Sequence, residues 1–276
     1  MTDRYVQDED RVDARPARPN GTAVLIVAGS SGRMETARAE LLASQGVHAR
    51  TIRWFGGAAQ RPAPHEVPLE IFAAEAESLR HDHDRVVLMG TSFGSEAVLL
   101  TASAEPVDAV IAIAPSSVVW PGLLDGGWSS HWTRGGRALA AVPFDGDWAP
   151  ETDPPAFRSL YERSLAAHER AAAAGAESPE IPVERIDGEV LLVHGGDDRV
   201  WPSDAFAQRI ARRRRAAGLD TAVIAHPDAG HRLVLPGERP PTGGTRMQRG
   251  GSEAADRELG LLAWPRIRDL LRIRAL

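Results

Sequence analysis

The sequence contains no cysteine and no lysine, and these two absences exclude several kinds of chemistry. Without cysteine among its 276 residues, the chain has no disulfide, no zinc site built on thiolates and no thiol nucleophile. All 32 basic residues are arginine, which excludes a Schiff-base lysine and the lysine of a phosphate-binding P-loop. A covalent intermediate would therefore have to form on another side chain.

Other classes of partner are disfavoured by charge and hydropathy. The net charge of −6 gives no overall attraction for nucleic acid or an anionic membrane. No run of 18 or more apolar residues occurs, and the acidic start MTDRYVQDED is unlike a secretory signal. The sequence therefore predicts a cytoplasmic protein with no nucleic-acid or membrane partner, and it gives no basis for an oligomeric state.

Short apolar runs alternate with longer amphipathic segments along the chain. The runs predict strands, and four of them are almost wholly apolar, as in parallel strands buried on both faces: Val24–Ala28, His48–Phe55, Arg85–Met89, Ala109–Ala114, Glu189–His194 and Thr221–His226. The amphipathic segments predict helices at Glu35–Gln45, Pro68–Arg80, Gly94–Ser103, Asp204–Ala217 and Glu253–Ile273. This alternation is typical of an α/β fold with a mostly parallel sheet flanked by helices.

Three segments depart from the alternation. Residues 1–20 are charged and proline-containing, and we expect a poorly ordered tail before a domain at 21–276. Residues 116–187, between the strands at 109–114 and 189–194, are too long for a plain connection and predict an inserted lid with a helix near 155–175. Residues 236–251 are rich in glycine and proline and predict a flexible loop.

The segment RVVLMGTSFGSEAVLL contains one G-x-S-x-G pattern, from Gly90 to Gly94. A strand precedes it and a helix follows it, so Ser92 is expected in a tight strand-to-helix turn with its hydroxyl above the sheet. The glycines suit a turn in which a Cβ would clash, and the helix N-terminus directs its positive dipole end at the serine. Ser92 is therefore a candidate nucleophile. Glu96, one turn later, is expected to complement that dipole.

A serine hydroxyl needs a base beside it, and the later strands supply candidates in the expected order. The strand at 189–194 leads into GGDDRVWP, where the spacing from Gly195 favours Asp198 as the acid, with Asp197 as the alternative or a turn cap. The last predicted strand is followed by PDAGH, which places His231 at a strand end as the general base.

An acyl-transfer site also needs donors for an oxyanion. The backbone N–H of Phe93 directly follows the candidate nucleophile, and the turn AGSSGR after the first strand offers the N–H of Ser30 or Ser31. This turn matches neither the dinucleotide-binding nor the P-loop pattern.

The remaining candidates are less specific. Trp120, Trp128 and Trp132 could form the wall of an acyl pocket or could simply pack the lid. His81 and His83 are expected to be solvated and not to bind a metal. The run Arg212–Arg215 is expected to be a solvated helix face, with a phosphate handle as the alternative. No cofactor and no metal are predicted.

With these residues in place, the chain resembles the C-terminal catalytic domain of acyl-CoA thioesterases and bile acid-CoA:amino acid N-acyltransferases, an α/β-hydrolase group close to the dienelactone hydrolases. The resemblance spans roughly residues 22–274 and is carried by RAELLA (38–43), GTSFGSEAVLLTAS, IAIAPSSVVWPG (111–122), LLVHGGDDRVWPS (191–203) and HPDAGH (226–231). It implies an α/β-hydrolase fold with Ser92, Asp198 and His231 as the triad.

The resemblance also guides the choice of substrate. The amino-acid transferases of the family use a cysteine nucleophile, so the serine here favours water over an amine as the acyl acceptor. The sequence thus predicts a serine hydrolase that cleaves a small-molecule acyl thioester, most simply an acyl-CoA. A carboxylesterase or lactone hydrolase without CoA preference, and a non-catalytic binding protein on a hydrolase scaffold, are the alternatives.

Overall fold

A seven-stranded sheet forms the centre of the computed structural model, which describes residues 5–171, 177–240 and 244–274. The strands follow the spatial order β1-β3-β2-β5-β6-β11-β12. Their bounds are β1 (Arg11–Ala14), β2 (Thr22–Val27), β3 (His48–Ile52), β5 (Arg85–Thr91), β6 (Ala109–Ile113), β11 (Glu189–Gly195) and β12 (Ala222–His226). Only the β1–β3 pair is antiparallel within this sheet, which confirms the predicted, mostly parallel α/β fold.

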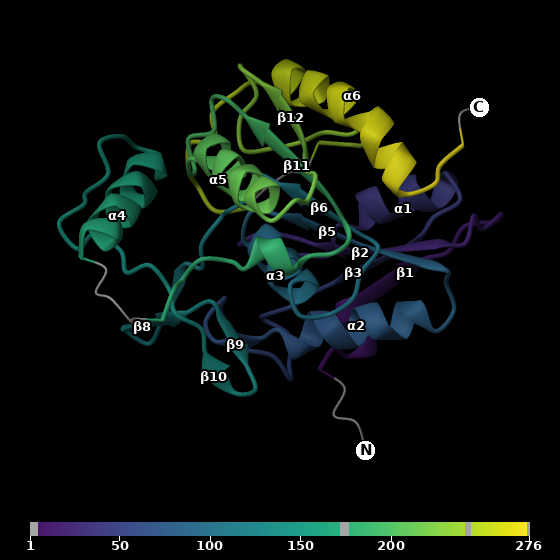
Figure 1. Ribbon diagram of the computed structural model, residues 1–276, viewed down its shortest axis with the longest axis horizontal. Helices are drawn as coiled ribbons and strands as arrows, with labels where there is room; N and C mark the ends of the chain where they lie inside the picture. Colours follow the sequence, from purple (N-terminus) through teal and green to yellow (C-terminus); the bar gives the residue numbers. More distant parts are fainter. Residues whose placement is uncertain (1–4, 172–176, 241–243, 275–276) are drawn as a thin grey trace.

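The apolar strands separate two cores, one on each face of the sheet. Along β2, Ala23, Leu25 and Val27 face one core, whereas Val24 and Ile26 face the other. The first core is covered by α2 (Glu70–Arg80), α3 (Phe93–Ala102) and α5 (Ser203–Ala216); the second is covered by α1 (Thr36–Ser44) and α6 (Glu253–Leu270) (Figure 1). Burial on both faces explains why the strands contain so few polar residues.

The N-terminal segment differs from the prediction of a poorly ordered tail over residues 1–20. Val6 is buried, a short 3₁₀ helix η1 covers Asp8–Asp10, and β1 pairs with β3 at the edge of the sheet. The antiparallel register places Asp13 opposite Arg50. A non-local pairing of this kind leaves no periodic signal in so short a segment, and the prediction was wrong for residues 5–14. Residues 1–4 lie outside the described residues.

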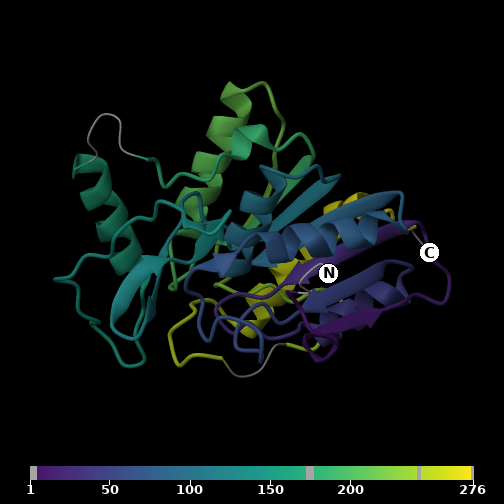
Figure 2. The same cartoon turned by 90° about the horizontal axis from the view of Figure 1, so that it is seen from below.

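The predicted insertion lies between β6 and β11. It contains the hairpin β7 (Pro121–Leu124) and β8 (Gly127–Ser130), then β9 (Trp132–Arg134), β10 (Arg137–Ala138), α4 (Arg158–Ala171) and the 3₁₀ helix η2 (Val183–Arg185). Strand β9 also pairs with β4 (Val67–Pro68). This pairing connects the insertion to the segment before α2. Figure 2 shows α4 and the hairpin at one end of the molecule, away from the sheet.

The glycine- and proline-rich segment forms no helix or strand over 236–240 and 244–251, in agreement with the predicted loop, while 241–243 lie outside the described residues. In the part of the chain that the structure describes, no helix is both long and apolar enough to cross a membrane.

Candidate active site

Ser92 occupies a strained turn between β5 and α3. Its backbone has φ 58° and ψ −124°, a conformation that non-glycine residues rarely adopt. Its N–H donates to Ile113 O (3.0 Å), and its C=O accepts from Ser95 N (2.7 Å). The turn therefore fixes the serine at the carboxyl end of the central strands, where the sequence placed it.

The glycines of the pentapeptide are required by close backbone approaches. A Cβ on Gly90 would lie 2.1 Å from Gly94 O, and one on Gly94 would lie 2.3 Å from Val27 O. Such distances are far below van der Waals contact, so α3 could not pack against β2 and β5 with any side chain at these positions. The clash that the sequence analysis expected at both glycines is present.

Asp198 and His231 are hydrogen-bonded at the ends of β11 and β12. His231 Nδ1 lies 2.9 Å from Asp198 Oδ2 and 3.0 Å from Oδ1, and both side chains are buried. The carboxylate is fixed further by Val200 N (2.9 Å) on Oδ1 and by the Ser203 hydroxyl (2.6 Å) on Oδ2. A carboxylate held by several donors can orient the imidazole and stabilise its protonated form.

The neighbouring Asp197 faces away from the histidine. Its carboxylate accepts from Gly251 N (2.8 Å) and from Arg199 Nε (3.0 Å). The Gly251 bond, opposed by partial burial and helped by Arg199, lowers the pKa of Asp197. The structure therefore gives Asp197 the loop-capping position that the sequence offered as the alternative role, and it gives Asp198 the contact with His231.

Ser92 and His231 both line a cavity of about 960 Å³. Within the described residues the Ser92 hydroxyl makes no hydrogen bond to His231; the imidazole instead packs edge-on to Trp201, with ring centroids 5.8 Å apart. In enzymes without bound substrate such bonds are often long and tighten when the substrate binds.

The turn after β2 approaches Ser92 very closely. A Cβ on Gly29 would lie 2.9 Å from Ser92 Cβ, so only glycine fits there. Gly32 N donates to Gly29 O (2.9 Å), which makes Ser30 and Ser31 the central residues of a four-residue turn on the cavity wall. Among the described residues, the N–H groups of Phe93, Ser30 and Ser31 donate no hydrogen bond, so they are available to donate to a ligand oxygen.

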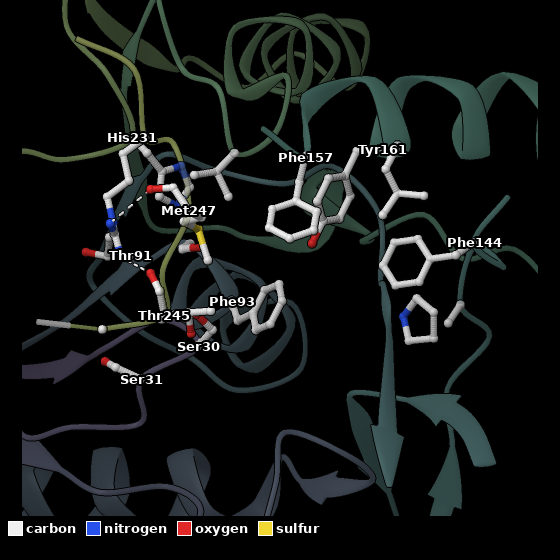
Figure 3. Close-up of a pocket in the computed structure, with 18 of the residues that line it drawn as sticks. Ser30, Ser31, Thr91, Phe93, Phe144, Phe157, Tyr161, His231, Thr245 and Met247 are labelled. Carbon is white, nitrogen blue, oxygen red and sulfur yellow. Dashed lines mark hydrogen bonds between the residues drawn. The ribbon is translucent and has the colours of Figure 1, made fainter. Parts of the chain in front are cut away.

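Aromatic side chains from the insertion line the far end of the cavity. They are Trp128, Phe144, Trp148, Phe157 and Tyr161. Figure 3 shows Phe144, Phe157 and Tyr161 at one end, His231, Thr245, Ser30 and Ser31 at the other, and Phe93 between the two groups. The cavity therefore has an apolar arm and a polar arm that meet near the nucleophile turn.

Of the three tryptophans proposed from the sequence, only Trp128 lines this cavity, with 59 % of its surface exposed. Trp120 and Trp132 are fully buried and do not line the cavity; Trp120 packs within the insertion, whereas Trp132 packs against Trp54 and Phe72 in the core beside the sheet. Their indole N–H groups donate to Ser116 Oγ (2.9 Å) and Glu96 Oε2 (3.0 Å). For these two residues the alternative, ordinary packing, is what the structure contains.

Glu96 has a larger structural role than complementing the helix dipole. It is completely buried, and Oε2 accepts from Trp132 Nε1, from Trp120 N (3.3 Å) and from His131 Nδ1 (3.4 Å). The His131 ring packs at a tilt of 48° against Phe93, with centroids 4.1 Å apart. Glu96 thus joins α3, the helix that follows Ser92, to the insertion.

Several residues at the site were not predicted from the sequence. Ser203, Phe157 and Tyr161 gave no motif, although the aromatic residues of 144–161 are dense enough to suggest a pocket wall. Arg232 and Arg249, which also line the cavity, come from loops that only the fold brings together.

Comparison with known families gives a match over most of the chain. Residues 67–243 match the family described as BAAT / Acyl-CoA thioester hydrolase C terminal. Acyl-coenzyme A thioesterase 6 of Mus musculus is 34 % identical over 94 residues, which are 32 % of this chain and 22 % of that protein. Peroxisomal succinyl-coenzyme A thioesterase of Mus musculus is 36 % identical over 67 residues, 24 % of this chain and 16 % of that protein. The matched segments span less than a quarter of either relative.

Solved structures with the same fold extend over nearly the whole chain. A putative dienelactone hydrolase from Klebsiella pneumoniae subsp. pneumoniae MGH 78578 has a TM-score of 0.53 at 15 % identity, covering 94 % of this chain and 91 % of that one. TT1662 from Thermus thermophilus has a TM-score of 0.53 at 17 % identity, covering 94 % and 92 %. At such identities the likeness concerns the fold, which is that of the α/β hydrolases.

Proposed function

The chain belongs to the BAAT / acyl-CoA thioester hydrolase C-terminal family, and on that premise we propose that it is a serine hydrolase that cleaves acyl thioesters, with an acyl-CoA as substrate. The observation that carries the proposal is the Asp198–His231 pair beside the same cavity as Ser92, which sits in a strained turn at a helix N-terminus. Relatives named as acyl-CoA thioesterases support the thioester bond as the target.

In the proposed mechanism Ser92 Oγ attacks the thioester carbonyl while His231 Nε2 accepts its proton. Asp198, held by Ser203 and Val200 N, keeps Nδ1 protonated and stabilises the imidazolium. Collapse of the tetrahedral intermediate breaks the carbon–sulfur bond, and His231 returns the proton to the thiolate. Water, deprotonated by His231, then attacks the acyl-serine and releases the acid, with the proton returning to Ser92.

The oxyanion of each tetrahedral intermediate is assigned to two backbone donors. Phe93 N–H directly follows the nucleophile at the start of α3, where the helix dipole adds to the stabilisation. Ser30 N–H is the second donor, because Ser30 follows Gly29, the residue of the turn that lies against Ser92. Ser31 is one residue farther along the turn and is the alternative.

We place the acyl chain in the arm of the cavity that Phe144, Phe157 and Tyr161 line. Aromatic walls of this kind favour an apolar ligand, and the cavity volume of about 960 Å³ suits a substrate larger than a simple ester. The insertion at 116–187 would then act as the lid of a single hydrolase domain at 21–276.

A fluorophosphonate probe followed by substrate comparison tests the proposal. The wild type should be labelled and should hydrolyse acyl-CoA, and Ser92→Ala should lose the label and at least about 10³-fold of turnover. Equal or faster turnover of an oxygen ester of the same acyl group would make the chain a carboxylesterase. A wild type that is neither labelled nor active would indicate a binding protein on a hydrolase scaffold.

A further inference from the structure

Three arginines lie on the polar arm of the cavity, and we refer to Arg33, Arg232 and Arg249 as the arginine cluster. They come from the three loops that build the site: Arg33 follows the Ser30–Ser31 turn, and Arg232 is next to His231 in sequence. The carbonyl oxygen of Arg249 accepts from His231 N (2.9 Å). The cluster is thus connected through the backbone to His231, the proposed general base, and to the Ser30–Ser31 turn, which supplies the proposed oxyanion donor.

The three guanidinium groups are close enough to act on one another. Burial, and then the charges of Arg232 and Arg33, lower the pKa of Arg249. Burial and the charge of Arg33 also lower the pKa of Arg232, against the opposing influence of Asp256 and Glu35. Like charges held together in a half-buried cavity destabilise the folded state unless something else compensates for the repulsion.

The carboxylates near the cluster, Glu35 and Asp256, offset only part of its positive charge. Glu35 accepts from Arg33 Nε (2.9 Å), and Asp256 accepts from Gly230 N (2.9 Å). The guanidinium of Arg249 is held by two backbone carbonyls, Thr245 O (2.7 Å) and Met247 O (3.4 Å), and forms no ion pair with any residue that the structure describes. Among the described residues, the three arginines of the cluster are thus accompanied by two carboxylates, which leaves an excess of positive charge on this arm.

Because the opposite arm is aromatic, the cavity as a whole suits an amphipathic substrate with an apolar acyl chain and an anionic group. We propose that the arginine cluster is an anion subsite that binds a phosphate or carboxylate oxyanion of the substrate while the reacting carbonyl lies at Ser92. Arginine suits this task, since its planar fork of donors matches such oxyanions. The inference rests on the proposed thioesterase function. On a CoA thioester the group would be a phosphate of the leaving thiol.

Substrates with and without phosphates test the subsite. Arg232→Met and Arg249→Met should each raise KM for hexanoyl-CoA about tenfold more than KM for hexanoyl-pantetheine, which has the same thioester and no phosphate. Arg249→Lys keeps the charge and should recover part of the loss. Arg246→Met is the matched control, because Arg246 lies in the same loop, pairs with Asp153 and does not line the cavity.

A second pair of substrates separates the two sources of the anion. If the acyl group supplies the anion, the same variants will raise KM for adipoyl-pantetheine, which has a terminal carboxylate, more than KM for hexanoyl-pantetheine. If Arg232→Met and Arg249→Met change KM equally for all three thioesters, the arginines are structural and the proposal is wrong.

Binding of free CoA to the Ser92→Ala protein, measured by calorimetry, does not depend on turnover. It should weaken about tenfold when Arg232→Met is added and should weaken further with salt. An inactive wild type whose CoA affinity depends on Arg232 would refute the proposed function and support the subsite. If the wild type is active, but neither the affinity for free CoA nor the ratio of KM values changes when the arginines are replaced, the subsite alone would be refuted.

Discussion

Two regions of the molecule hold arginines close to other charges, and they differ in what lies between the guanidinium groups. At the edge of the sheet, carboxylates and arginines alternate in a set that we refer to as the edge network: Arg11, Asp13, His48, Arg50 and Glu75. In the cavity, Arg33, Arg232 and Arg249 lie close enough for their charges to act on one another, with fewer carboxylates among them.

The edge network is satisfied by its own members. Arg50 Nε donates to Asp13 Oδ1 (2.9 Å) and Nη1 donates to Glu75 Oε2 (2.9 Å), while Arg11 Nε donates to the same Glu75 oxygen (3.1 Å). Arg50 and Glu75 are both buried. A buried charge with complete partners holds β1, β3 and α2 together, whereas the arginine cluster retains positive potential for a ligand.

The largest expected effect is on turnover. Three aspartates are each replaced by the isosteric asparagine, and only one of the three variants is expected to lose most of its kcat. Asp198→Asn should lower kcat about 10³- to 10⁴-fold, because the amide no longer stabilises the imidazolium or fixes its tautomer. Asp197→Asn, in the loop cap, and Asp13→Asn, in the edge network, should change kcat less than about threefold. Steady-state hydrolysis of one acyl-CoA measures all three variants.

The structural reason for the contrast is that only Asp198 contacts His231. Comparable losses for Asp197→Asn and Asp198→Asn would mean that the catalytic acid has been assigned to the wrong residue. Loss of turnover in Asp13→Asn would mean that the edge network acts on the reaction, and the distinction between the two regions would disappear.

A smaller effect, on stability, distinguishes the two kinds of arginine. Arg50→Met leaves Asp13 and Glu75 with fewer donors in a buried setting, and it should cost about 3 kcal/mol of unfolding free energy. Arg249→Met loses two bonds to backbone carbonyls but also relieves repulsion, so it should cost less than about 1 kcal/mol. Urea unfolding of the two variants makes the comparison. Equal losses of unfolding free energy in the two variants would show that the arginine cluster is a structural network like the edge network.

Local sequence patterns predicted six of the seven strands of the sheet and the candidate site residues that follow three of them. The six predicted strands are all present, and four of them are nearly continuous apolar runs, which indicate strands buried on both faces. Ser92, Asp198 and His231 each lie at the end of a strand, and parallel strands bring such positions to one edge of the sheet. These inferences depended on periodicity and chain order, which the sequence contains directly.

Features that depend on contacts between distant segments were not predicted. The sequence left open whether Trp120 and Trp132 form a cavity wall or are packed; they are packed, with their indoles donating to Ser116 and Glu96, pairings that have no sequence signal. In the run 212–215, expected to be a solvated face, Arg214 is buried and donates to Val183 O (2.9 Å) and Ile186 O (2.7 Å). The arginine cluster is of the same kind, since three separate loops supply it.

The smallest expected effect is the pH dependence of stability that Asp13 contributes to the edge network. Burial would raise the pKa of Asp13, but hydrogen bonds from His48 and Arg50, together with their charges, hold it well below its usual range. A carboxyl whose pKa is lower in the folded state stabilises the protein above its unfolded pKa of about 3.9. That contribution is lost as the pH falls from about 4 through the folded pKa.

Urea unfolding between pH 3 and pH 7 measures this contribution. The unfolding free energy of the wild type should fall more steeply below pH 4 than that of Asp13→Asn, which has no proton to bind at this position. Because Asp13 is only half-buried, solvent screening keeps the difference small, below about 1 kcal/mol at pH 3. Parallel curves for the two proteins would mean that Asp13 gains nothing from its partners on folding, and that the edge network is held by Glu75 and its two arginines instead.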